Sequence, residues 1–158
     1  MTGPRKDFMQ QAIAAAIEGL RAGEGGPFGA LVARGDEVVA VACNRVLSRN
    51  DPTAHAEIEA IRAACAKLST YQLEGCDLYA TCEPCPMCLA AAYWARADRV
   101  FHACDRDDAA RAGFGDADFH REIALPARER RLPVVSFERE AGLSVFHAWL
   151  EKPDKRLY

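Results

Sequence analysis

Hydrophobic and polar positions recur along the chain in patterns that predict helices and strands in alternation. Residues 5–22 carry apolar side chains every three or four positions and are followed by a glycine, which is typical of an amphipathic helix and its end. Two apolar runs, 28–33 and 37–44, flank the turn 34–36 (Arg-Gly-Asp), and this pattern indicates a β-hairpin. The further elements that we expect are helices over 54–68 with Thr53 as the cap, 86–94, 108–112, 126–131 and 143–150, and strands over 77–81, 99–103 and 133–137.

This order of elements predicts an α/β layer fold. A hairpin followed by alternating helices and strands is typical of a mixed sheet with helices on its faces. The chain has 158 residues, close to the usual size of one domain, so residues 1–158 are expected to form a single domain. The charged, glycine-bearing segment 105–123 is expected to be mainly loop, and the polar segment 151–158 is too short to form a core of its own.

The composition is that of a globular protein. Hydrophobic residues make up 50% and charged residues 27% of the chain, which excludes a disordered or fibrous protein. The formal net charge of −3 argues against nucleic acid as the main partner, because proteins that bind the phosphate backbone are usually basic. The charge-free stretch 84–95 is shorter than the roughly 18 residues of a membrane span. We therefore expect neither a nucleic-acid partner nor a membrane partner.

The cysteines cannot all pair within one chain, because there are seven of them. The first residues lack the charge pattern and apolar length of a secretory signal, which favours a cytoplasmic protein with reduced thiols. In that compartment cysteines serve as metal ligands, nucleophiles or core residues, and disulfides are rare.

Two short motifs, 55–57 (His-Ala-Glu) and 85–88 (Cys-Pro-Met-Cys), carry the candidate chemistry. Each lies where a loop or strand passes into an expected helix, and helix N-termini favour thiolate over thiol. Cys85 and Cys88 are spaced so that both sulfurs can face one point, and His55 can supply a third ligand. Three ligands leave one coordination position open, which is the pattern of a catalytic zinc site.

A carboxylate is expected beside such a metal. Two thiolates and one imidazole leave a bound zinc ion nearly neutral, so a neighbouring group must accept and return the proton of water. Glu57 is the candidate, since H-x-E together with P-C-x-x-C is the known signature of the zinc deaminases. In a regular helix Glu59, not Glu57, would share a face with His55. Glu57 can therefore act only if the metal lies beyond the end of the helix.

Cys82 leaves an alternative open, because it extends the spacing to C-x-x-C-x-x-C. Such a run is compatible with four sulfur ligands or an iron–sulfur cluster. We interpret Cys82 as a strand-end residue, since Pro84 separates it from the following helix. The remaining cysteines are interpreted as small core or near-surface residues, and the remaining histidines as structural.

With these motifs the sequence resembles the cytidine-deaminase-like zinc deaminases, and among them the bacterial guanine deaminases. The zinc motif is common to the whole superfamily. The combination of an Ala-Gly-Phe segment with Asp116 and a terminal tyrosine is what makes the resemblance specific to the guanine deaminases. The matching stretches extend over nearly the whole chain: 25–30 (GGPFGA), 50–57 (NDPTAHAE), 71–73 (YQL), 82–88 (CEPCPMC), 93–96 (YWAR), 112–114 (AGF) and Tyr158.

The resemblance implies a fold, an assembly and a reaction. The fold is a three-layer α/β/α arrangement with a five-stranded mixed sheet and helices on both faces. The assembly is a homodimer that exchanges C-terminal segments, about residues 138–158, between subunits. One Zn²⁺ per chain would be held by His55, Cys85 and Cys88. The reaction would be hydrolytic deamination of guanine to xanthine and ammonia.

The resemblance also assigns roles by position. Glu57 and Asp116 would be catalytic, with Asp116 assisting proton transfer near the leaving amine. The amide of Asn44, at a strand end, offers both a donor and an acceptor to a purine edge. Tyr158 would belong to a lid over the substrate. The substrate-binding residues assigned in this way are Phe28, Asn44, Ala56 and Tyr158.

The residues alone leave other functions open. One alternative is deamination of guanosine or of another aminopurine or aminotriazine. A second is tRNA adenosine deamination, against which the acidic charge balance argues. A third, from a different class, is a non-catalytic zinc-binding module, against which the open coordination position and the carboxylate of H-x-E argue.

Overall fold

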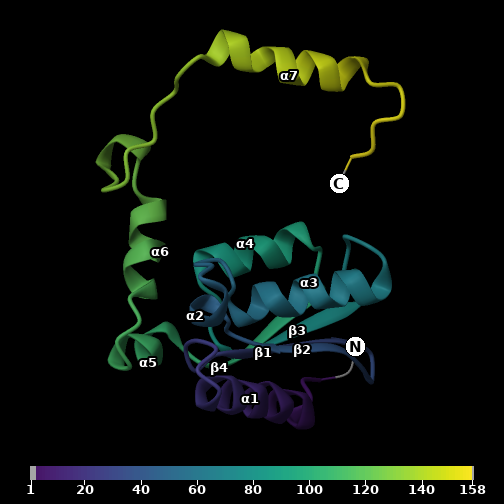
Figure 1. Ribbon diagram of the computed structural model, residues 1–158, viewed down its shortest axis with the longest axis vertical. Coiled ribbons are helices and arrows are strands. Elements are labelled where there is room, and N and C mark those ends of the chain that lie inside the picture. The colour runs from purple at the N-terminus through teal and green to yellow at the C-terminus, as the bar shows by residue number, and fades with distance from the viewer. Residues whose placement is uncertain (1–2, 158) are drawn as a thin grey trace. The chain divides into compact units, whose positions relative to one another are not determined.

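The computed structural model describes residues 3–157, with the backbone alone for residues 116 and 117. The chain forms two compact units, the first ending at His120 and the second running from Arg121. Helix α6 (Asp116–Ala124) spans this boundary, and the second unit continues with a 3₁₀ helix (Ala127–Glu129) and α7 (Arg139–Glu151). The elements before α6 are α1 (Lys6–Arg21), β1 (Gly29–Arg34), β2 (Glu37–Cys43), α2 (Val46–Arg49), α3 (Ala56–Leu68), β3 (Cys76–Cys82), α4 (Pro86–Trp94), β4 (Arg99–Cys104) and α5 (Arg106–Arg111) (Figure 1).

The strands form one mixed sheet of four, in the order β2-β1-β3-β4. β1 is antiparallel to both of its neighbours, with Leu31 opposite Val41 on β2 and Tyr79 on β3, whereas β3 and β4 are parallel. The expected α/β fold with a mixed sheet is therefore confirmed.

The prediction of a fifth strand over 133–137 is wrong for the residues that the structure describes. That segment has no regular structure and lies in the second unit, where the described residues form helices and their connections. A strand needs a neighbour to pair its backbone groups, and Pro133 in addition lacks an N–H. The apolar composition of the segment indicated a strand, but this part of the chain offers it no partner.

Helices cover both faces of the sheet, α1 on one and α3 with α4 on the other (Figure 1). Alternate residues of β1 supply the two cores, because successive side chains of a strand point to opposite faces. Leu31 and Ala33 pack with Phe8 of α1, whereas Ala30 and Val32 join the core that includes α3. A strand buried on both faces explains why β1 has a continuous apolar sequence rather than an alternating one.

Helix α3 begins differently from the expectation. His55 is its N-cap, with φ −67° and ψ 155°, and the prediction of Thr53 as the cap is wrong. The N–H and the hydroxyl of Thr53 both donate to the Asp51 carboxylate, at 2.8 and 2.7 Å. Side chains of this type form local turns readily, and here the turn uses the polar groups that a cap would need.

The connections are more helical than expected, except at one place. The segment 105–123, expected to be mainly loop, contains α5 and most of α6. The polar segment that follows β2 contains the short helix α2. The helix expected over 126–131 is reduced to a single 3₁₀ turn.

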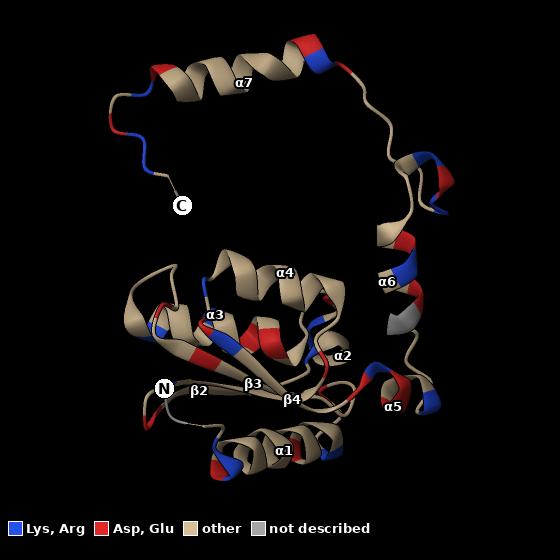
Figure 2. Cartoon of the chain, turned by 180° about the vertical axis from the view of Figure 1, so that it is seen from behind, with Lys and Arg blue, Asp and Glu red and all other residues tan. Residues whose placement is uncertain are grey.

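Helix α4 carries no charged residue (Figure 2). It has nine residues, far fewer than the roughly 20 that a bilayer-spanning helix needs. Across residues 3–157, no helix is both long enough and apolar enough to cross a membrane.

Close packing of α1 on β1 depends on Gly29. A Cβ at this position would overlap the carbonyl oxygen of Ala12 and lie 2.9 Å from the backbone nitrogen of Ala16. Because these are backbone atoms, Gly29→Ala should lower the free energy of unfolding by about 1–3 kcal/mol, as overpacking does. Urea unfolding followed by circular dichroism measures the change.

The control is Gly3→Ala in the exposed segment before α1, where an added Cβ meets nothing within 4 Å. The free energy of unfolding of this variant should match that of the wild type. An unaltered free energy of unfolding for Gly29→Ala would contradict the packing described for α1.

Candidate metal and catalytic site

The N-termini of α3 and α4 bring the candidate metal ligands together. His55 is the N-cap of α3 and Cys85 the N-cap of α4, both with extended backbone, and Cys88 lies in the first turn of α4. Pro86 occupies the first helical position, where its missing N–H needs no partner and its fixed φ suits a helix start. The three side chains therefore meet beyond the ends of two helices.

The three ligand atoms form a nearly equilateral triangle. His55 Nδ1 lies 3.6 Å from Cys85 Sγ and 3.5 Å from Cys88 Sγ, and the two sulfurs are 3.6 Å apart. Tetrahedral zinc with bonds of about 2.3 Å to sulfur and 2.0–2.1 Å to nitrogen requires sulfur–sulfur edges of about 3.8 Å and sulfur–nitrogen edges of about 3.5 Å. The triangle therefore fits zinc. Of the residues that the structure describes, this is the one group close enough to hold a metal ion.

The two thiols hold their protons very unequally. The hydrogen bond with Cys88 lowers the pKa of Cys85 to about 4, and His55 also favours its thiolate. The same bond, together with burial and the nearby Glu57, raises the pKa of Cys88 above its ordinary value. Metal binding requires both sulfurs as thiolates, so it would release the proton held on Cys88.

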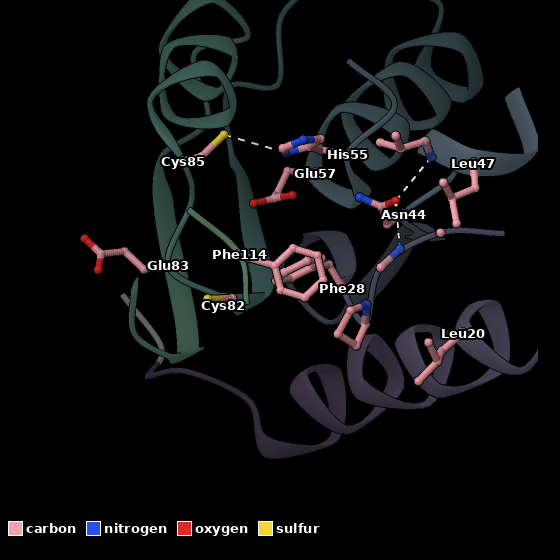
Figure 3. Close-up of a pocket in the computed structure, with 14 residues that line it drawn as sticks. Leu20, Phe28, Asn44, Leu47, His55, Glu57, Cys82, Glu83, Cys85 and Phe114 are labelled. Atoms are coloured by element: carbon pink, nitrogen blue, oxygen red, sulfur yellow. Dashed lines mark hydrogen bonds between the residues drawn. The ribbon is translucent and has the colours of Figure 1, made fainter. Parts of the chain in front are cut away.

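Glu57 lies in the first turn of α3, directly beside His55, Cys85 and Cys88, the three candidate ligands that we call the metal group. The residue is 8% exposed, and burial raises the pKa of its carboxyl to about 7, although its own backbone N–H and His55 act in the opposite direction. Its side chain lines the cavity described below (Figure 3). A buried carboxyl with a pKa near neutrality can both accept and return a proton, which is what a general acid–base needs.

Glu59 has a different environment, although only one residue separates it from Glu57. Its carboxylate is paired with Arg49 at 2.9 Å and with Arg62 at 3.3 Å. His55 has a non-helical backbone, so the helical rule that would align it with Glu59 does not apply to it. Glu57 is consequently the glutamate that accompanies the metal group.

The metal group opens into a cavity of about 470 Å³ in the first unit. This volume is within the usual range for sites that bind small molecules. Phe28 and Phe114 form an apolar part of its wall, with ring centroids 4.8 Å apart and planes at 79°, an edge-to-face contact (Figure 3). The cavity thus combines a metal group and a buried acid with an aromatic surface.

Asn44 follows the end of β2 and also lines the cavity. The residue is 5% exposed, and its Oδ1 accepts hydrogen bonds from the backbone N–H groups of Gly26 at 3.2 Å and Val46 at 3.1 Å. These two bonds hold the amide in one orientation.

The other residues assigned to the site fall in different places. Ala56 is fully buried and belongs to the core beneath α3, so any substrate contact would come from its backbone N–H. The side chain of Asp116 and the whole of Tyr158 lie outside the described residues. Their assigned roles stay predictions.

Cys82 lines the cavity without belonging to the metal group. It ends β3, and its thiol donates to the carbonyl oxygen of Asp105 at 3.3 Å. This position agrees with its interpretation as a strand-end residue.

The sequence pattern does not reveal the role of Phe114, the last residue of the Ala-Gly-Phe segment. Its N–H donates to the carbonyl of Ala109 at 3.0 Å, which turns the chain after α5. The contact with Phe28 joins segments far apart along the chain. Only the family likeness of the segment, not its local pattern, marked it as a place of interest.

Comparison with known proteins gives the family. Residues 3–104 match the cytidine and deoxycytidylate deaminase zinc-binding region. The chain is 48% identical to guanine deaminase of Bacillus subtilis (strain 168) over 151 residues, which cover 96% of this chain and 97% of that protein. It is 43% identical to a tRNA-specific adenosine deaminase of Aquifex aeolicus (strain VF5) over 100 residues, which cover 63% of this chain and 66% of that one.

Solved structures show the same relationship. The fold is similar to that of guanine deaminase from Bacillus subtilis with a TM-score of 0.94 at 47% identity, over 99% of both chains. For guanine deaminase from Nitrosomonas europaea the TM-score is 0.68 at 31% identity, over 73% of this chain and 67% of that one. The triangle of ligand atoms, which has the size that zinc needs and lies beside a buried glutamate, agrees with a relationship to zinc-binding deaminases. This chain belongs to the cytidine and deoxycytidylate deaminase zinc-binding family.

Proposed function

We propose that this protein is a guanine deaminase, which converts guanine and water to xanthine and ammonia. The observation that carries the proposal is the buried Glu57 beside the group of His55, Cys85 and Cys88, at the wall of a cavity of small-molecule size. The choice of guanine is supported by the likeness to a guanine deaminase over 96% of the chain.

The proposed reaction uses few groups of the chain. Zinc held by His55, Cys85 and Cys88 would supply a Lewis acid and a water of lowered pKa. Glu57 accepts a proton from the water whose oxygen attacks C2 of guanine. It then gives that proton to the ring nitrogen beside C2. The amine takes the remaining proton of the attacking oxygen and leaves as ammonia, and this oxygen becomes the C2 carbonyl of xanthine. We assign help in the last proton transfer to Asp116.

Substrate binding is assigned to residues around the same cavity. The ring of Phe28, supported by Phe114, would pack against the flat face of a purine. Asn44 would hydrogen-bond the purine edge, and Ala56 would contribute its backbone N–H. Tyr158 would close the site as part of a lid.

The main alternative, tRNA adenosine deamination, is less well supported. The likeness to the tRNA-specific deaminase of Aquifex aeolicus covers 63% of this chain, whereas that to guanine deaminase includes nearly all of it. A spectrophotometric screen with guanine, guanosine, adenine, cytosine and ammeline tests the substrate class. Turnover of another of these compounds, with none of guanine, would overturn the proposal.

We also propose that the protein is a homodimer that exchanges about residues 138–158 between subunits. The second unit leaves large apolar side chains in water, among them Phe137 at 85% and Phe146 at 65% exposure. The central part of α7 carries no charged residue (Figure 2). Surfaces of this kind usually pack against a partner. Light scattering of the purified protein tests the dimer.

The metal group generates the first prediction about activity. Purified protein should contain about one zinc per chain, and Cys85→Ala or Cys88→Ala should lose metal and guanine turnover together. Cys82→Ser is the matched control and should retain both, since Cys82 lies outside the group. Mass spectrometry measures the zinc content of the wild type and of each variant. Loss of zinc from Cys82→Ser but not from Cys88→Ala would show that the wrong pair of cysteines was chosen.

The proton-transfer role generates a second prediction. Glu57→Gln keeps the shape of the side chain but cannot accept a proton, so kcat should fall by at least about 10²-fold while zinc is retained. Glu59→Gln is the comparison: it weakens the pairing with Arg49 and Arg62 but should affect kcat mildly. Steady-state kinetics with guanine measures both. The reverse order of effects would refute the assignment of Glu57.

The C-terminal segment generates a third prediction. The described residues 152–157 are exposed and form no helix or strand. Deletion of residues 153–158 should leave zinc content and melting temperature near those of the wild type. Guanine turnover should collapse, because the lid no longer excludes water or holds the purine. Tyr158→Phe should lose part of the activity. A truncated enzyme with wild-type kcat and KM would eliminate the lid.

A further inference from the structure

The amide of Asn44 has a defined polarity. Its oxygen accepts from the N–H groups of Gly26 and Val46, at 3.2 and 3.1 Å. Both neighbours are donors, so a flipped amide would place its own N–H₂ against two N–H groups. The oxygen is thereby committed to the backbone, and the nitrogen must face the other way.

The nitrogen Nδ2 faces the cavity. In Figure 3 it points toward the side on which His55 and Glu57 lie. Asn44 is 5% exposed, and within residues 3–157 no acceptor is bonded to Nδ2. Among the described residues no fully buried side-chain nitrogen or oxygen lacks a partner, so Nδ2 is a donor open to the cavity, and a ligand that enters gains a hydrogen bond by offering an acceptor there.

Gly25 makes this arrangement possible. A Cβ on Gly25 would overlap Oδ1 of Asn44 and lie 3.1 Å from its Cγ. The loop cannot easily move away, because the carbonyl of Glu24 accepts from the N–H groups of Leu47 and Ser48 at 3.2 and 3.0 Å. Any larger residue at position 25 would therefore displace the Asn44 amide.

We infer that Gly25 is a positioning residue that fixes the donor of Asn44 toward the cavity, so that the site selects the purine edge presenting a hydrogen-bond acceptor. The inference rests on the proposed function and adds that Asn44 donates the hydrogen bond which the purine accepts. The partner is a carbonyl oxygen or a ring nitrogen of the purine. An edge that presents an amine at this point would meet a second donor and be rejected.

The test compares three variants of the zinc-loaded enzyme with guanine as substrate. Gly25→Ala should raise KM about tenfold, the effect of one lost hydrogen bond, with kcat within about threefold and zinc content unchanged. Ser48→Ala is the control, since it removes the hydrogen bond from the Ser48 hydroxyl of α2 to the carboxylate of Glu24, the residue before Gly25, without contacting Asn44. It should behave like the wild type. Equal effects of the two variants, or an unchanged KM for Gly25→Ala, would overturn the inference.

Asn44→Asp keeps the test decisive if Gly25→Ala does not fold. Aspartate can still accept from Gly26 and Val46, but it presents an acceptor to the cavity in place of the donor. KM should rise by more than tenfold and by more than in Asn44→Ala. A wild-type KM for Asn44→Asp would mean that the cavity uses an acceptor, and the inference would be wrong.

Purine analogues identify the acceptor. 2-Aminopurine lacks the carbonyl oxygen, 7-deazaguanine lacks N7 and 3-deazaguanine lacks N3, and each is measured as a competitor of guanine. At least one should bind the wild type more weakly than guanine, and this deficit should disappear in Asn44→Ala. Equal binding of all three, or deficits that persist in Asn44→Ala, would overturn the inference. Absence of guanine turnover by the wild type would instead refute the proposed function.

Discussion

Convergence of two helix N-termini on one point is the constraint on which the site depends. An N-terminus presents unpaired N–H groups and a partial positive charge, and both favour thiolates. With His55 and Cys85 as N-caps, two of the three ligand side chains leave the chain before the helical periodicity begins, and Cys88 follows in the first turn of α4. The metal group can then be shared by two helices that need not be parallel or in register with one another.

The sheet keeps these two helix ends in place. β1 and β3 are neighbouring central strands, and β1 is buried on both faces, by α1 and by α3. Because Gly29 lets α1 approach the backbone of β1 closely, the loop that follows α1 is held over the cavity. Packing on one face of the sheet thus brings the loop that contains Gly25 to a site whose metal ligands come from the helices on the other face, and Asn44 meets this loop from the end of β2.

Those parts of the fold and the site that depend on local pattern or on family likeness could be predicted from the sequence. The helices around the two motifs were predicted nearly to their ends, and the group of His55, Cys85 and Cys88 followed from spacing. Thr53 was assigned wrongly because nothing local reveals that Asp51 engages it. The prediction of a strand over 133–137 was wrong for a related reason. Apolar residues indicate a tendency to form a strand, but they do not show whether a neighbouring strand is present to pair with it. The contact of Phe114 with Phe28 joins distant segments, and no local pattern encodes it.

The separation of Glu57 and Glu59 on one turn of α3 has a consequence for charge. One carboxylate lies against two guanidinium groups, while the other faces the metal group and the cavity. The helix backbone keeps these environments apart over a very short stretch of chain. The ion pairs of Glu59 and the basicity of Glu57 can therefore be changed independently, by evolution or by a protein engineer.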